Sequence, residues 1–194
     1  MGERKEENRA GIRQDMASLR LDMPQQTKCA ADQRIADLIT STALWKSCAT
    51  VFAYMAYRGE PCLERVINTG LLEGKTVALP VCLDDSHMAF FKIESSTEVK
   101  TGRYGIAEPL YTDDARIREA DGRTLVLLPC LAFDRRGYRL GYGKGYYDRY
   151  LSGHKDAETM ITAYAFQQVD RIPELEGDIS SAWIVTEAGV CRAE

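Results

Sequence analysis

Residues 125–151 read LVLLPCLAFDRRGYRLGYGKGYYDRYL, and this stretch guides the interpretation of the whole chain. It opens with a continuous apolar run, Leu125 to Leu128, which has the length and character of a strand buried on both faces of a sheet. Pro129 ends the run, because proline has no N–H to donate to a neighbouring strand. The stretch therefore predicts a central strand followed by a long loop.

The loop has glycine at every second position: Gly141, Gly143 and Gly145. Without a Cβ atom, such a backbone can adopt positive φ and lie close against a ligand. From Tyr146 the residues are typical of a helix's first turns, where successive N–H groups form a site for anions. Arg139 and Lys144 add positive charge, and Asp148 stands where a carboxylate could hold Mg²⁺ beside a phosphate. A surface turn with solvated charges is the alternative for these glycines alone.

Neither of two common phosphate-binding motifs matches the loop. The G-x-x-x-x-G-K-[ST] spacing of a Walker A motif is absent, and no G-x-G-x-x-G directly follows a strand. The wider block is more specific. RLGYGKGYYDRYL at 139–151, preceded by LLPCLAFDRRG at 127–137, resembles the signature of the 5-formyltetrahydrofolate cyclo-ligase (methenyltetrahydrofolate synthetase) family. The resemblance covers nearly the whole chain after Asn8, and the GIAEP block at 105–109 supports it without suggesting a mechanism.

Length and charge narrow the class of protein. The chain has 194 residues, which predicts one domain with a core large enough to be stable without disulfides. Its formal net charge of -4 gives no reason to expect a nucleic-acid partner. No stretch approaches the length of a membrane span, and the N-terminus is too charged for a secretory signal. We expect a cytoplasmic protein with no membrane partner.

The cysteines and histidines argue against a metal or disulfide framework. Six cysteines are scattered without a C-x-x-C pair, as expected of reduced thiols in the cytoplasm. The two histidines, His87 and His154, lie far apart and away from any pair of thiols, so a zinc site is not indicated. A redox or nucleophilic role for one cysteine is the alternative.

The N-terminal region predicts a helix that begins at Arg9, with Ile12 and Met16 on its apolar face. Residues 1–8 are charged, and we expect a disordered tail there. From the sequence alone this is a packing helix with a solvated basic face. The resemblance implies that a basic pair on it, Arg9 and Arg13 here, contacts ATP. The family pattern has lysine at the first position, and arginine is not its equivalent.

A second stretch that we single out is Ala49 to Tyr54, a predicted buried strand, followed by Glu60 and Pro61 at the start of a helix. An acidic residue at a helix start is usually a stabilising feature, and that is the alternative here. The resemblance implies instead that Glu60 binds the pterin ring of a folate, whose amine and ring N–H suit a charged acceptor. It also implies an apolar contact from Met55.

The resemblance assigns the phosphate chemistry to the glycine loop. Lys144 and Arg139 are implied to be catalytic, because positive charge stabilises a phosphoryl group in transfer. Besides Arg9 and Arg13, the implied ATP contacts are Arg139, Leu140, Gly141, Tyr142, Gly143, Lys144, Gly145, Tyr146 and Tyr147. Besides Met55 and Glu60, the implied substrate contacts are Tyr142, Gly143, Lys144, Gly145 and Tyr146.

The resemblance also implies a magnesium site at Asp148 and Asp178, the second of which precedes the last predicted strand. The family often has another aspartate four residues after this position, where the chain has Ala182. If that acid rather than Asp178 held the metal elsewhere in the family, this chain would bind Mg²⁺ more weakly.

Strands and helices alternate along most of the chain, which predicts an α/β fold: a single three-layer domain at 9–194 with a mainly parallel central sheet flanked by helices. Ligands of such sheets lie beyond the carboxyl ends of the strands. The loops that follow Tyr54 and Leu128 both have that position. We therefore expect Glu60 and the glycine loop to face one cleft.

The implied reaction is the ATP-dependent cyclisation of 5-formyltetrahydrofolate, a small-molecule substrate that can carry a polyglutamate tail, to 5,10-methenyltetrahydrofolate with release of ADP and phosphate. ATP would phosphorylate the formyl oxygen and N10 would then attack the activated carbon. Two alternatives stand beside it. One is a relative that binds folate or nucleotide without turnover, and the other is an isomerase-like enzyme that uses the basic loop for a substrate phosphate. We expect a monomer.

Overall fold

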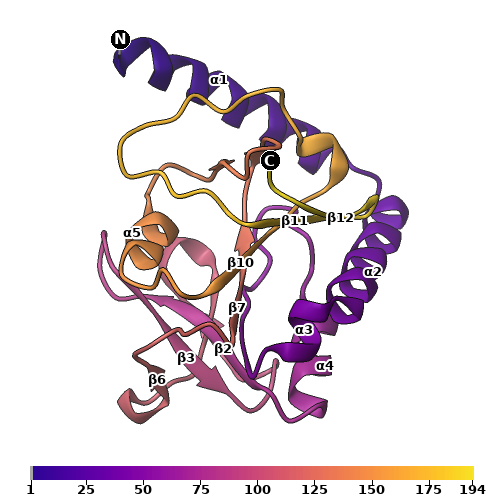
Figure 1. Ribbon diagram of the computed structural model, residues 1–194, viewed down its shortest axis with the longest axis vertical. Coiled ribbons are helices and arrows are strands. Elements are labelled where there is room, and N and C mark those ends of the chain that lie inside the picture. The colour runs from indigo at the N-terminus through magenta and orange to yellow at the C-terminus, as the bar shows by residue number, and fades with distance from the viewer. Residues whose placement is uncertain (1) are drawn as a thin grey trace.

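The structure, a computed structural model, describes residues 2–194 and has a three-layer α/β architecture (Figure 1). Within these residues the central sheet has eight strands in the order β12-β11-β10-β7-β1-β2-β3-β6. Neighbouring strands from β11 to β2 are parallel, whereas β12, β3 and β6 add antiparallel edges. The predicted mainly parallel α/β sheet is confirmed.

The strands and helices have the following bounds. The sheet strands are β1 Thr50–Phe52, β2 Thr76–Cys82, β3 Met88–Ile93, β6 Arg116–Ile117, β7 Thr124–Pro129, β10 Glu158–Thr162, β11 Trp183–Thr186 and β12 Gly189–Arg192. Two small ribbons pair β4 Val99–Thr101 with β5 Ala107–Pro109 and β8 Ala132–Phe133 with β9 Arg139–Leu140. The helices are α1 Gly2–Leu21, α2 Gln25–Ser41, α3 Ala43–Ser47, α4 Glu64–Leu72 and α5 Tyr146–Ser152, with 3-10 turns η1 Arg103–Gly105, η2 Asp113–Ala115 and η3 Ala165–Gln167.

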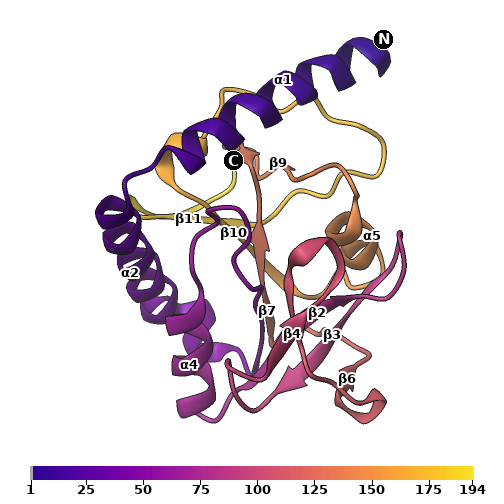
Figure 2. The same ribbon diagram turned by 180° about the vertical axis from the view of Figure 1, so that it is seen from behind.

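Along the central strands, alternate side chains pack into two separate hydrophobic cores, one on each face of the sheet. In β7, Leu125 and Leu127 pack with α2, α3 and α4, whereas Val126 and Leu128 pack with α5 on the opposite face. All four are fully buried, as predicted from the continuous apolar run. The sheet therefore lies between a layer of three helices and a layer formed by α5 (Figures 1 and 2).

Helix α1 lies across the end of the sheet at which the parallel strands finish (Figure 2). Ile12 and Met16 pack against a cluster that includes Leu140 and Ile172. Here the structure corrects the sequence analysis, because residues 2–8 form the first turns of this helix rather than a disordered tail. Lys5 Nζ donates a hydrogen bond to the carbonyl oxygen of Glu174 (2.9 Å), which ties these turns to the C-terminal part of the chain.

The spacing of Ile35, Leu38 and Ile39 predicts a second helix from about Ala30 to Thr42 with these residues facing inward. In the structure, helix α2 begins earlier, at Gln25, directly after Pro24. Proline is well suited to the beginning of a helix, because it lacks the N–H that would have no partner there. The helix buries Ile35 and Ile39, as predicted.

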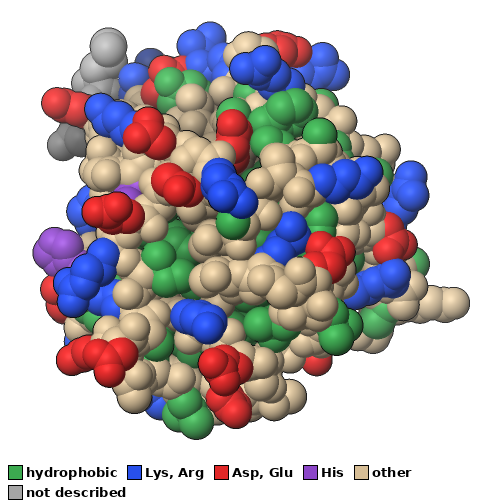
Figure 3. All heavy atoms as spheres, turned by 60° about the horizontal axis from the view of Figure 1, so that its bottom comes forward, with side chains coloured by type: hydrophobic (Ala, Val, Ile, Leu, Met, Phe, Trp, Pro, Cys, Tyr) green, Lys and Arg blue, Asp and Glu red, His purple; other side chains and the backbone are tan. Residues whose placement is uncertain are grey.

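The surface mixes both charges. On the face in Figure 3, Lys and Arg side chains are interspersed with Asp and Glu, so no large field of one sign forms there. None of the helices within residues 2–194 combines the length and the apolar character needed to cross a membrane.

Candidate active site

The carboxyl ends of β1, β7 and β10 meet under α1, and the segments that leave these ends form the candidate site. Parallel strands direct their carboxyl ends to one edge of the sheet, which is where such folds bind ligands. The segment after β1 carries Glu60, and the segment after β7 continues through β8 and β9 into the glycine loop. The rings of Tyr57 and Tyr142 join them, with centroids 5.8 Å apart.

Two of the three glycines of the loop adopt the positive φ angles that the sequence predicted. Gly143 has φ of 92° and Gly145 has φ of 67°, a region that side chains with a Cβ rarely adopt. Within the described residues, the N–H groups of residues 142–145 donate to no other backbone carbonyl. The loop therefore offers a row of N–H donors directly before α5, which suits an anion.

Helix α1 supplies two arginines to this region. Arg13 Nε donates to the carbonyl oxygen of Gly141 (3.0 Å), and its guanidinium lies against Gly143. Arg9 lies deeper, with 6% of its surface exposed, and pairs with Asp178 through Nη1 and Oδ2 (2.6 Å). The structure thus brings Arg13 to the glycine loop and Arg9 to the segment before β11.

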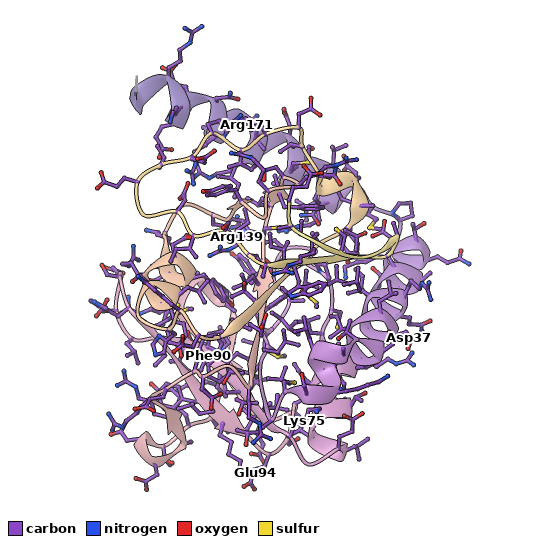
Figure 4. The ribbon with its side chains drawn as sticks, in the orientation of Figure 1. Asp37, Lys75, Phe90, Glu94, Arg139 and Arg171 are labelled. Carbon is purple, nitrogen blue, oxygen red and sulfur yellow. The ribbon has the colours of Figure 1, made fainter. Side chains whose placement is uncertain are left out.

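Arg139 and Asp148 lie at the centre of the site and contact each other. Arg139, labelled in Figure 4, lies between α5 and the segment that precedes β11. Its Nη2 donates to Oδ1 of Asp148 (3.1 Å), and its Nη1 donates to the carbonyl oxygen of Ile179 (2.8 Å). The N–H of Ile179 donates to the same Oδ1 (3.1 Å). Asp148 therefore lies close in space to the residue that follows Asp178.

Lys144 is exposed at the tip of the loop, with its Nζ 5.7 Å from the centre of the Tyr104 ring. Tyr104 is held at φ of 59° in η1, and its hydroxyl lies 3.2 Å from that of Tyr146. Tyr146 also donates to the carbonyl oxygen of Asp84 (2.8 Å). Turn η1, which leads into the GIAEP block at 105–109, therefore borders the glycine loop through Tyr104.

Glu60 is buried, with 5% of its surface exposed, and its Oε2 accepts a hydrogen bond from the N–H of Tyr57 (3.0 Å). Burial raises the pKa of Glu60 to about 7, against the opposing effects of the Arg20 charge and of the Tyr57 hydrogen bond. A carboxyl group that changes charge near neutral pH beside a ligand loop is typical of functional sites. Glu60 is not an acid at a helix start, because α4 begins at Glu64 rather than at Pro61 as the sequence predicted.

Several of the predicted contact residues have side chains that pack into the protein. Leu140 is fully buried in the cluster under α1, and Met55 packs against the core formed with α2 to α4. Tyr147 lies edge-on to Phe90, and burial raises its pKa well above the usual value for tyrosine. The side chain of Leu140 therefore packs in the cluster under α1 and that of Tyr147 packs against the core beside α5, so for these two residues the backbone is the more accessible contact for a ligand.

The carboxylates present a sparse set of metal ligands. Among residues 2–194, no group of three or more His, Cys, Asp or Glu side chains is arranged to hold a metal ion. Asp178 accepts hydrogen bonds at both oxygens, from Arg9 and from the N–H of Leu175. Asp148 accepts at Oδ1, which leaves Oδ2 open within the described residues. Ala182, which stands where the family often has an aspartate, offers no side-chain ligand, and its N–H donates to Thr159 Oγ1 (3.1 Å).

Three of the six thiols are held in the protonated, unreactive form by burial. Cys130 is buried beside the site, and burial raises the pKa of its thiol to about 12, which keeps it protonated. Cys48 and Cys82 also have pKa values raised by burial. These three cysteines are packing residues.

Two cavities of about 380 Å³ lie beside the candidate site. One is lined by Lys5, Asn8, Arg171, Pro173 and Glu174, between α1 and the segment before β11. The other lies along α5, where Tyr146, Arg149 and His154 line it together with Arg116 and Arg118 from around β6. Neither of these two cavities is lined by Glu60 or Lys144, whereas the rings of Tyr57 and Tyr142 lie in edge contact between the Glu60 segment and the glycine loop.

One residue of the site was missed by the sequence analysis. Arg20, near the end of α1, is 2% exposed and joins the segments that carry Glu60 and Tyr142. Its signal in the sequence is weak, because it stands among several other basic residues of the same helix.

Comparisons with known proteins show which family the chain belongs to. The model of the 5-formyltetrahydrofolate cyclo-ligase family matches residues 5–187. A protein of Schizosaccharomyces pombe described as a probable 5-formyltetrahydrofolate cyclo-ligase is 34% identical over 113 residues, which span 57% of this chain and about half (55%) of that protein. The 5-formyltetrahydrofolate cyclo-ligase of Haemophilus influenzae is 27% identical over 179 residues, 89% of this chain and 94% of that protein.

The fold is shared as well. The NMR structure of the 5,10-methenyltetrahydrofolate synthetase of Aquifex aeolicus superposes with a TM-score of 0.81 at 27% identity. The superposition covers 95% of this chain and 92% of that chain. The similarity therefore extends over almost the whole chain.

Proposed function

The chain belongs to the 5-formyltetrahydrofolate cyclo-ligase family and is an enzyme of that class, and on this premise we propose how its residues perform the reaction. The reaction is the cyclisation of 5-formyltetrahydrofolate to 5,10-methenyltetrahydrofolate, with ATP converted to ADP and phosphate. One observation supports it most strongly. A loop of free N–H donors and basic side chains adjoins the segment that carries a buried carboxyl group, Glu60.

The chemistry explains why such a site suffices. The oxygen of a formamide is a poor leaving group, so transfer of the γ-phosphoryl group of ATP to this oxygen activates the formyl carbon. N10 of the folate then attacks that carbon, and the oxygen leaves as phosphate. The protein needs to align the two substrates and to stabilise the transferred charge, more than it needs a nucleophile of its own. The thiols near the site, which are held protonated, agree with this scheme.

The glycine loop is the proposed phosphate site. The free N–H groups of 142–145 would contact phosphate oxygens, and Arg13 beside Gly143 would add positive charge. Lys144 is exposed and forms no ion pair with the side chains that the structure describes, so we propose that its ammonium group contacts the phosphoryl group in transfer. Arg139, in β9 directly before the glycine loop, donates hydrogen bonds to Asp148 and to the carbonyl oxygen of Ile179. We propose that these bonds orient the loop.

The folate would bind with its pterin ring at Glu60. The exocyclic amine and the ring N–H of a pterin present two parallel donors, which match a carboxylate. The rings of Tyr57 and Tyr142 contact each other between the Glu60 segment and the glycine loop, and we propose that folate binding displaces Tyr142, the more exposed of the two rings. The displaced ring remains beside the ligand and can stack on it.

Two carboxylates with further ligands from phosphate oxygens and water are a donor set that Mg²⁺ accepts. Asp148 fits this role through its open Oδ2. Asp178 would fit only if it gave up its contacts with Arg9. Mg²⁺ bound with the nucleotide would neutralise part of the phosphate charge. We propose Asp148 as the principal ligand and Asp178 as a residue that holds Arg9.

The finer assignments complete the proposal. A cytoplasmic location is supported by six cysteines that are all free thiols in the structure. We propose a monomer, and a folate substrate whose polyglutamate tail extends from the site into solvent.

The decisive experiment follows the methenyl chromophore by absorbance after mixing the protein with 5-formyltetrahydrofolate, ATP and Mg²⁺. An increase that requires all three additions is the expected result. Folate binding in calorimetry without any increase would support the binding-protein alternative. Phosphate-dependent isomerisation of a sugar phosphate without ATP would support the isomerase alternative.

A further inference from the structure

Arg20 is a buried arginine whose hydrogen bonds connect three separate segments. Its Nε donates to the carbonyl oxygen of Arg58 (2.9 Å), and its Nη1 donates to that of Cys130 (3.0 Å). Its Nη2 donates to the hydroxyl group of Tyr142. These acceptors belong to the segment after β1, the segment after β7 and the glycine loop.

The segment that carries Glu60 packs closely against Arg20. Gly59 has φ of 78°, and a Cβ at this position would lie 3.4 Å from Cγ and from the carbonyl oxygen of Arg20. Glu60 follows immediately in the chain. Arg20 therefore fixes the backbone on the N-terminal side of Glu60 through both packing and the bond to Arg58.

Arg20 is also the cation that faces Glu60. Tyr54, Cys130, Tyr142 and Tyr147 also interact electrostatically with Glu60, and burial raises the pKa of each of them. These four groups are uncharged at neutral pH. Arg20 donates its hydrogen bonds elsewhere, so it acts on the Glu60 carboxylate through space.

We propose that Arg20 is a positioning residue for folate recognition, which joins the Glu60 segment to the glycine loop and supplies the positive charge that favours the Glu60 carboxylate. This inference rests on the proposed function of Glu60. The three acceptors explain why arginine is used, because the planar guanidinium donates in several fixed directions at once and an ammonium group does not. Helix α1 thus places Arg13 beside the proposed phosphate site and Arg20 beside the proposed pterin site.

A purely structural role makes a different prediction. A buried arginine that only stabilises the fold would lower the melting temperature when replaced, without changing how folate affinity depends on pH. A positioning role on Glu60 changes that dependence, because a folate that needs the carboxylate binds according to the fraction of Glu60 that is ionised.

The test measures binding of 5-formyltetrahydrofolate by calorimetry, without ATP, between pH 6 and pH 9. For the Arg20→Met variant we expect the midpoint of the pH dependence to move upward by about one pH unit, which makes binding roughly fivefold weaker at pH 7. The difference from the unmodified protein should shrink towards pH 9. Arg20→Lys keeps the charge, so its midpoint should stay near that of the unmodified protein while its affinity falls at every pH.

The outcomes separate this inference from the function on which it rests. An unchanged midpoint in a folded Arg20→Met protein would overturn the inference. If that variant does not fold, Arg20→Lys decides, because a loss of stability with unchanged affinity would overturn the inference equally. An unmodified protein that binds no 5-formyltetrahydrofolate at any pH would refute the proposed function instead.

Discussion

Arg139 donates a hydrogen bond of 3.1 Å to Asp148, so a residue expected to bind phosphate and a residue expected to bind metal are each other's partners in the structure. The pair lies between β9 and α5, and Ile179 bonds to both of its members. It thereby connects the glycine loop to the segment that precedes β11. Because the bond uses Oδ1 alone, the carboxylate retains one oxygen for a further ligand.

Asp148→Asn should weaken the response to magnesium. An amide is a poorer ligand for Mg²⁺ than a carboxylate, so we expect the Mg²⁺ concentration at half-maximal activity to rise by at least about tenfold. The measurement is an activity titration with MgCl₂ at saturating ATP. Asp156→Asn, on the exposed turn after α5, is the control and should behave like the unmodified protein. An unchanged titration of Asp148→Asn would remove this residue from the metal site.

Asp178→Ala should destabilise the fold. It leaves the buried guanidinium of Arg9 without its carboxylate partner, which typically costs about 3 kcal/mol or more. The measurement is urea unfolding followed by circular dichroism. The matched control is Asp37→Ala, which breaks the exposed pair with Arg65 and should change stability by less than about 1 kcal/mol. Equal losses for the two variants would contradict the assigned role of Asp178.

Lys144→Ala should lower kcat far more than it weakens folate binding. Loss of a charge that stabilises the phosphoryl group in transfer costs about 100-fold or more in kcat. The melting temperature should stay the same, because Lys144 is exposed and contributes little packing. Steady-state kinetics and calorimetry measure the two effects, and Lys155→Ala, another exposed lysine, is the control. A kcat equal to that of the unmodified protein would show that Lys144 has no catalytic role.

Glu60→Gln should change how stability depends on pH. The pKa of Glu60 is about 7 in the folded protein, above its ordinary value of 4.5, so the folded state holds the proton more tightly than the unfolded state. The stability associated with this proton is complete below pH 4.5 and is lost as the pH rises to 7. The neutral amide avoids this loss, so we expect Glu60→Gln to be more stable by about 3 kcal/mol at pH 8.

Urea unfolding at pH 4.5, 6 and 8 tests this prediction. The gain in stability of Glu60→Gln over the unmodified protein should grow across the series, while folate binding is lost at each pH. A constant difference would mean that Glu60 titrates normally in the folded state.

Gly137→Ala should be strongly destabilising. Gly137 has φ of 79°, and a Cβ there would overlap the carbonyl oxygen of Ser181 in the segment before β11. That backbone contact cannot relax like a flexible side chain, so we expect a loss of more than about 3 kcal/mol. Gly177→Ala is the control, because its φ of 89° is similar but a Cβ there would meet open space. It should cost only about 1–2 kcal/mol, from backbone strain. Similar losses would show that crowding against Ser181 is unimportant.

The sequence predicted the sheet well because its signals are local. The run from Leu125 to Leu128 and the stop at Pro129 define β7, and the alternation along such strands fixes which side chains meet each helical layer. The positive φ angles of Gly143 and Gly145 also follow from residue type, because glycine is the residue that adopts them freely.

The N-terminus was mispredicted for the opposite reason. A run of charged residues has no apolar period, and by itself it favours a frayed tail. In the structure Lys5 and Arg9 bond to Glu174 and Asp178, and these contacts support the first turns of α1 from outside the helix. Helix formation there depends on a segment more than 160 residues away.

The sequence by itself determined the α/β architecture, the glycine loop and the family, since each depends on residue types at fixed short spacings. The tertiary structure alone decided how the charges are used. It buried Glu60, gave Arg9 to Asp178 and Arg139 to Asp148, and placed Arg20 between three segments. Such pairings depend on where the ends of different strands meet. The residues adjacent to a charged residue in the sequence do not indicate which distant group will bury it or neutralise its charge.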